Sequence, residues 1–185
     1  MISVGRKFLT ELELNQRVEL RLGDMTKFSD QIPEQIHAVS CVFALHHLPS
    51  YDALTSCIQE IARVRQRSGC AVWLFDFTRP RHPRTPYVFP EILTPETPLE
   101  FRIDTRNSLM ASFSFEELCS VLTHSSIEPM QHRCARFMQL YQAHWVGEPT
   151  INGPGHHLWQ STELGQQAHK DFQLLRNLFP AVPLD

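Results

Sequence analysis

The chain has 185 residues, of which 42% are hydrophobic and 20% are charged, and its formal net charge is -3 at pH 7. This composition is typical of a globular domain with a sizeable core, and a weakly acidic chain has no net attraction for nucleic acid or for an anionic membrane surface. No apolar run approaches the roughly 18 residues that a membrane-spanning helix needs, and the N-terminal MISVGRKFL lacks the features of a secretory signal. We therefore expect a cytoplasmic protein that binds no membrane.

The cysteines suggest neither disulfides nor a metal site. They are five in number, widely spaced and mostly set among apolar residues, unlike a disulfide framework or paired metal-binding cysteines. We expect small buried thiols and no bound metal. The five are Cys41, Cys57, Cys70, Cys119 and Cys134.

The first third of the chain predicts one helix and two strands. Apolar residues at helical spacing predict a helix over residues 3–14, and alternation of apolar and charged residues predicts a one-sided strand over 17–22. Residues 39–45 are apolar on both faces, as in a central strand of a parallel sheet.

A strand–helix–strand unit continues from there. Residues 51–67 carry an apolar stripe, with Ser50 as N-cap and Gly69 just beyond the last turn, and residues 70–77 form a second strand that is apolar on both faces. Short connections between these segments imply a right-handed parallel crossover. The fold class is therefore α/β, with a mostly parallel sheet and helices on both faces.

The C-terminal half is less regular. Six prolines within residues 79–98 predict a long loop without regular helix, and a capping box predicts a helix from Ser114 to about Ser125. Two strands at about 129–137 and 139–147 form an antiparallel C-terminal pair. We place an α/β domain at residues 1–150, followed by a loop and an amphipathic helix over 163–179 within a C-terminal segment, residues 151–185.

Candidate ligand-binding residues follow two of the predicted strands. Asp24 and Met25 come after the first, and His46 and His47 come after the second. In open α/β sheets, ligands bind in the crevice beyond the carboxyl ends of the strands. If neighbouring strands run in the same direction, Asp24 and the two histidines converge on one hollow.

Four stretches resemble class I S-adenosylmethionine-dependent methyltransferases: RVELRLGDMTKF, VSCVFALHHLPSYDAL, CIQEIARVRQRSGCAVWLFDF and SFSFEEL. The resemblance covers residues 1 to about 147 and implies a Rossmann-like sheet with S-adenosylmethionine as cofactor. The first two of the family's usual seven strands, and the glycine-rich turn after the first, have no counterpart here. The resemblance therefore leaves occupancy by the cofactor open.

The resemblance implies a set of cofactor contacts. The carboxylate of Asp24 lies near the adenine amino group, Met25 supplies a backbone or apolar contact, and the segment containing Ala44, Leu45 and His46 flanks the methionine portion. A carboxylate accepts a hydrogen bond from an exocyclic amine, and an apolar wall packs against the purine. The alternative for Asp24 is a plain turn, because Gly and Asp dominate turns.

The two histidines are candidate catalytic groups. Neighbouring side chains on an extended segment point to opposite faces, so His46 and His47 are not expected to bind one metal ion together. The one that faces the crevice could accept a proton from an attacking hydroxyl or amine near neutral pH. The alternative is an imidazole that caps the next helix or bonds a backbone carbonyl.

Asp76, Arg79 and Arg81 end the second apolar strand, where a family member begins to contact its acceptor. Arginines suit carboxylates or phosphates, and the alternative is that they are solvated or paired at the surface. Methyl transfer from a sulfonium mainly needs alignment, so the absence of other catalytic motifs does not exclude an enzyme. A small-molecule acceptor is favoured over nucleic acid.

The lack of two central strands leaves sheet edges to be repaired. The strand at 17–22 could pair directly with that at 39–45, a second copy or a complementing chain could associate, or the chain could be a piece of a longer product. Two functions follow. One is a methyltransferase, or part of one, and the other is an inactive methyltransferase-like module that acts through self-association or a partner.

Overall fold

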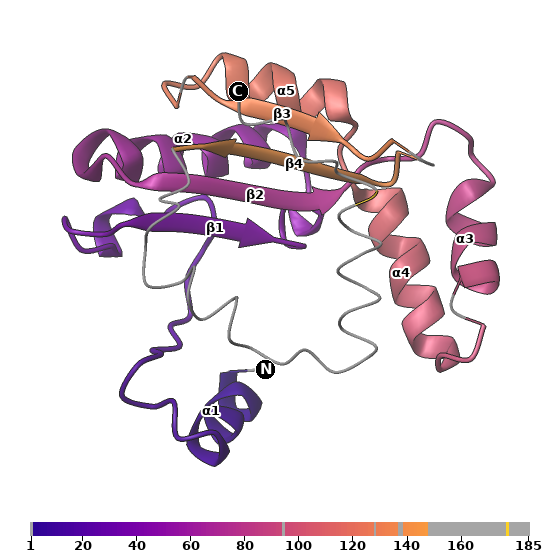
Figure 1. The fold of residues 1–185 in the computed structure, drawn as a ribbon, viewed down its shortest axis with the longest axis horizontal. Coiled ribbons are helices and arrows are strands. Elements are labelled where there is room, and N and C mark those ends of the chain that lie inside the picture. The colour runs from indigo at the N-terminus through magenta and orange to yellow at the C-terminus, as the bar shows by residue number, and fades with distance from the viewer. Residues whose placement is uncertain (1, 94, 128, 137–138, 148–176, 178–185) are drawn as a thin grey trace.

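The computed structural model describes residues 2–93, 95–127, 129–136 and 139–147, together with Asn177 (Figure 1). The predicted C-terminal segment 151–185 and its helix at 163–179 lie outside the described residues, apart from Asn177. Among the residues described, no helix is both long enough and apolar enough to cross a membrane.

Four described strands form one mixed sheet. They are β1 (Ala38–Val42), β2 (Ala71–Phe77), β3 (Gln131–Cys134) and β4 (Tyr141–Val146), in the spatial order β1-β2-β4-β3. β1 and β2 are parallel, whereas β4 runs antiparallel to both β2 and β3. The α/β class and the antiparallel C-terminal pair are confirmed. The expectation of a mostly parallel sheet is wrong for these strands, because β4 inserts between β2 and β3 and contributes two antiparallel pairings.

The crossover helix α2 (Tyr51–Ser68) forms as predicted. The Ser50 side chain accepts a hydrogen bond from the Ala53 N–H, and Gly69 ends the helix in the left-handed conformation, with φ 67°. Both ends of the helix thus satisfy backbone groups that would otherwise lack partners.

The helix α5 (Phe115–Thr123) begins at the predicted capping box. The Ser114 side chain accepts from the Glu117 N–H, and the Glu117 carboxylate accepts from the Ser114 N–H. α2 and α5 cover the same face of the sheet (Figure 1), and their apolar stripes form the core with it. The buried apolar residues of that core include Leu54, Ile58, Ile61, Val72, Leu74, Leu118, Leu122 and Val146.

The opposite face of the sheet is open over its described part. Val42 of β1 and Trp73 of β2 are exposed over 49% and 44% of their surfaces. The expectation of helices on both faces is therefore met on one face only within the described residues. Trp73 and Trp145 are register partners on this face, with ring centroids 5.8 Å apart.

The proline-rich region contains a helix, which corrects the prediction of a loop without regular helix. Nine of its residues form α3 (Thr85–Leu93), and α4 (Leu99–Ala111) begins after Pro98. Pro86 lies in the first turn of α3 and Pro98 is the N-cap of α4, where a missing N–H removes no helical hydrogen bond. Pro90 lies inside α3 and is accommodated within a helix of nine residues.

The N-terminal helix is confirmed and the strand after it is not. α1 covers Ile2–Glu11, whereas residues 17–22 form no strand. A strand needs a neighbour for its N–H and C=O groups, and β1 pairs with β2 alone in the described sheet. The alternation at 17–22 therefore has no ladder to join, and direct pairing of this segment with β1 does not occur.

All five cysteines are free thiols. Cys57 and Cys70 are buried as expected, and the remaining three are half-buried.

Gly147, which directly follows β4, is closely packed against β2. Its φ is 111°, and an added Cβ would lie 2.8 Å from the Cβ of Ala71. We expect Gly147→Ala to lower the free energy of unfolding by about 1–3 kcal/mol through backbone strain and steric overlap. Urea denaturation measures the difference. Gly23→Ala is the control because nothing lies within 4 Å of its added Cβ, and equal stability of the two variants would contradict the packing described.

Candidate functional site

The place where a ligand crevice was predicted holds a short 3-10 turn after β1. The turn, η2 (Leu45–His47), begins after Phe43, whose φ of 48° takes the chain out of the extended conformation. The strand therefore ends three residues earlier than predicted. Because β1 and β2 are parallel, η2 lies beside the carboxyl end of β2.

Asp76 joins these two strand ends. Its Oδ2 accepts hydrogen bonds from the backbone N–H of Leu45 at 2.7 Å and of His46 at 3.3 Å, and its Oδ1 lies 2.6 Å from Nδ1 of His46. Asp76 is 2% exposed. The carboxylate thus positions η2, and its oxygens already have partners, unlike a group that reaches out to a substrate.

The two histidines lie side by side, which corrects the premise that they point to opposite faces. Their ring centroids are 4.2 Å apart, because residues in a 3-10 turn do not alternate as in a strand. His46 is buried and His47 is exposed. Within the described residues the two are not part of a metal-binding group.

The contact with Asp76 fixes how His46 can act. A carboxylate only accepts hydrogen bonds, so Nδ1 of the neutral ring carries the proton and Nε2 holds the lone pair. A general base whose ring is oriented by a carboxylate has this arrangement. His46 also contacts the ring of Phe77, with centroids 5.5 Å apart.

Ala44 and Leu45, the other residues of the predicted cofactor segment, differ in burial. Ala44 is half-buried at the start of η2. The Leu45 side chain is 1% exposed and belongs to the core, and its backbone N–H donates to Asp76.

Asp24 forms a turn with the residues after it. Its Oδ1 accepts from the backbone N–H and the hydroxyl of Thr26 at 2.8 and 2.7 Å, and these bonds hold the pKa of the carboxyl below its usual value. The side chain remains exposed, while Met25 packs against the core. The turn interpretation therefore holds, and the exposed carboxylate still leaves room for a ligand.

Glu60 of α2 fastens this segment to the core. Its Oε2 accepts from the N–H groups of Phe28 and Ser29, both at 2.7 Å, and Oε1 pairs with Arg63. Burial raises the pKa of Glu60, but the hydrogen bonds from Ser29 and Phe28 and the guanidinium of Arg63 outweigh it, so the pKa lies below its usual value.

Two cysteines of the core have raised pKa values. Burial raises the pKa of the Cys57 thiol to about 12, with further contributions from Cys41 and Asp24. Burial and Asp76 raise that of Cys41 to about 11. The expected convergence of Asp24 with His46 and His47 stays a prediction, because residues 17–22 form no strand beside β1.

The predicted substrate arginines are paired with α5. Arg79 donates to the backbone oxygen of Ser112 at 2.9 Å and to the carboxylate of Glu117 at 3.0 Å, and Arg81 donates to Glu116 at 3.3 Å. Both interactions fix the loop after β2 against the start of α5. They match the alternative in which these arginines are paired at the surface.

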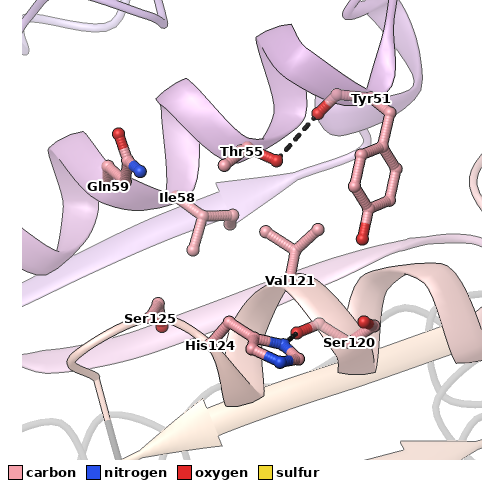
Figure 2. Close-up of a pocket in the computed structure, with 8 residues that line it drawn as sticks. All are labelled: Tyr51, Thr55, Ile58, Gln59, Ser120, Val121, His124 and Ser125. Atoms are coloured by element: carbon pink, nitrogen blue, oxygen red, sulfur yellow. Dashed lines mark hydrogen bonds between the residues drawn. The ribbon is translucent and has the colours of Figure 1, made fainter.

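A separate cavity of about 320 Å³ lies between α2 and α5 (Figure 2). Its walls are apolar at Ile58 and Val121 and polar elsewhere, and it contains none of the predicted site residues. The lining residues are Tyr51, Thr55, Ile58, Gln59, Ser120, Val121, His124 and Ser125.

A second polar cluster lies at the C-terminal hairpin, and the sequence interpretation missed it. Cys119 of α5, His132 of β3 and His144 of β4 bring their ligand atoms within 4.8 Å of one another. His144 is fully buried, and burial together with His132 lowers its pKa to about 3. One signal was available in the sequence. Gln142 and His144 lie four and two residues before Val146, so the predicted strand has two polar side chains on the same face as an apolar one.

Comparison of the sequence with protein-family models and with curated proteins finds no match.

The anchoring role of Glu60 predicts a pH dependence. A carboxyl whose pKa is lower in the folded state stabilises the fold above its unfolded pKa of about 4.5, and this contribution is lost as the pH falls through the folded value. We expect Glu60→Gln to lower the free energy of unfolding at pH 7 by about 1–3 kcal/mol. The difference in the free energy of unfolding between Glu60→Gln and the wild type should become smaller below about pH 5.

Denaturation by urea from pH 7 to pH 3 measures this. Glu34→Gln, at an exposed glutamate, is the control and should follow the wild type. A difference for Glu60→Gln that stays constant over this range would contradict the role of the charge.

Proposed function

We propose that this chain is a S-adenosylmethionine-dependent methyltransferase, or part of one, that acts on a small-molecule acceptor at the carboxyl ends of β1 and β2. The observation that carries the proposal is Asp76, which holds η2 and the His46 ring at the end of two parallel strands. Open α/β sheets bind ligands at that end. The four sequence stretches that resemble the family supply the identity of the cofactor.

The residues divide into two roles under this proposal. Asp24 binds the adenine amino group, and the backbone of Ala44 and Leu45 borders the methionine portion. His46 or His47 accepts the proton of the attacking acceptor, and Asp76 is the positioning residue that fixes the tautomer of His46. The methyl group leaves an already activated sulfonium, so alignment of donor and acceptor does most of the work.

The cofactor contact can be tested without knowing the acceptor. We expect S-adenosylhomocysteine to bind in isothermal titration calorimetry, and Asp24→Asn to weaken binding by about tenfold, equivalent to about 1.4 kcal/mol for one charged hydrogen bond. Asp30→Asn is the matched control because Asp30 is also exposed and lies in the same N-terminal segment.

Two outcomes would count against the proposal. If S-adenosylhomocysteine does not bind at concentrations up to millimolar, the proposed cofactor is wrong. Equal loss in Asp24→Asn and Asp30→Asn would remove Asp24 from the contact.

The open sheet face favours a second candidate, an interaction module that self-associates. Val42 of β1 and Trp73 of the neighbouring β2 are exposed, and the outer edge of β1 pairs with no other strand among the described residues. Exposed apolar surface next to an unpaired edge is typical of a docking surface.

Sedimentation velocity over a wide concentration range tests this candidate. We expect a mass that rises with concentration, and Val42→Lys to suppress the rise because a lysine on a strand edge opposes pairing. Lys27→Arg, at an exposed position away from the sheet, is the control. A monomer at every concentration would exclude self-association.

A further inference from the structure

The cluster at the C-terminal hairpin has the composition of a metal site. His132 and His144 are cross-strand partners in the β3–β4 register, with their Nδ1 atoms 2.7 Å apart. Cys119 comes from α5, which covers this end of the sheet, and all three ligand atoms lie within 4.8 Å of one another. Thiolate and imidazole are the ligands that zinc prefers.

The surroundings of His144 fix its tautomer. The Gln142 amide nitrogen donates to the backbone oxygens of Phe77 and Phe113 at 2.9 and 3.0 Å, so the amide oxygen is the atom that faces His144. That oxygen lies 3.1 Å from Nε2 of His144 and therefore accepts its proton. Nδ1 of His144 is left with a lone pair directed at His132.

This pattern is typical of metal-binding histidines. Such a ring commonly donates its second N–H to a carbonyl or carboxylate, which holds the ring in place for the metal. Gln142 is 1% exposed, and the Phe115 ring stacks on His144 with centroids 5.5 Å apart. The ring of His144 is therefore held in orientation by a hydrogen bond and by packing.

We propose that Cys119, His132 and His144 bind one zinc ion that fastens α5 to the β3–β4 hairpin, with a water molecule as fourth ligand. This site is independent of the proposed cofactor crevice. His132 and Cys119 are both half-buried, and β3 is the edge strand of the described sheet, which gives the ion a route from solvent.

Binding requires a small opening of the cluster. Zinc–nitrogen bonds of about 2.0–2.1 Å at a tetrahedral angle need Nδ1 atoms about 3.4 Å apart, somewhat wider than the pair without metal. The shared proton on Nδ1 of His132 moves through solvent to Nε2 of that ring. The Cys119 thiol loses its proton to solvent as the sulfur–zinc bond forms, so one proton is released per ion.

The test uses the full chain and zinc itself. Competition with a chromophoric chelator should give one zinc ion per chain at this site, and Cys119→Ser and His132→Gln should each weaken it by more than about 100-fold, beyond the effect of losing an outer hydrogen bond. Cobalt substitution should give a near-ultraviolet thiolate charge-transfer band that Cys119→Ser abolishes.

Matched controls separate this site from other ligands. Cys134→Ser removes a half-buried thiol outside the cluster, and His124→Gln removes an exposed imidazole at the end of α5. Both should bind zinc as the wild type does, and circular dichroism checks that every variant is folded.

Three results would overturn the proposal. The first is that the chain binds no stoichiometric zinc, and the second is that Cys119→Ser and Cys134→Ser bind zinc with equal affinity. The third concerns the adjacent histidines His156 and His157, the alternative zinc ligands in the sequence. It is that the double variant His156→Gln/His157→Gln loses zinc binding while His132→Gln keeps it. None of them bears on S-adenosylhomocysteine binding, whose failure would in turn leave the zinc site unaffected.

Discussion

The buried carboxylate of Asp76 determines how the chain is arranged at the carboxyl ends of β1 and β2. A charged group in the interior is costly unless each oxygen has a donor, and here the donors are two backbone N–H groups of η2, the backbone N–H of Phe77 and the imidazole of His46. Satisfying the carboxylate therefore requires that the chain leave β1 in one particular way. The left-handed backbone of Phe43 is the local cost of that path.

The polar interior continues across the sheet from Asp76. Gln142 is its register partner on β4, and His144 follows two residues later on the same face. Gln142 bonds the backbone at the end of β2 and just before α5, so it links the loop after β2 to the helix. Buried polar groups of this kind are tolerated because each has a partner, and they select one arrangement of helix and hairpin.

Local signals predicted several elements well. Both ends of α2 and the start of α5 were predictable because Ser50, Gly69 and the capping box act through hydrogen bonds within a few residues. Periodicity failed at 17–22, where a strand depends on a neighbour distant in sequence, and proline content failed at α3 and α4, where position within the helix matters more than number.

The sequence by itself determined the α/β class, the crossover unit, the helix caps and the presence of polar residues after two strands, since these depend on spacing and local bonding. Tertiary structure alone decided that β4 inserts between β2 and β3, that Asp76 holds His46, and that Cys119 meets His132 and His144. The physical reason is that most of these contacts join distant residues: Asp76 and His46 are 30 positions apart, and Val72 and Val146 of the β2–β4 pairing are 74 apart. Their formation depends on which strands pair, and the spacing of residues along the chain does not predict that pairing.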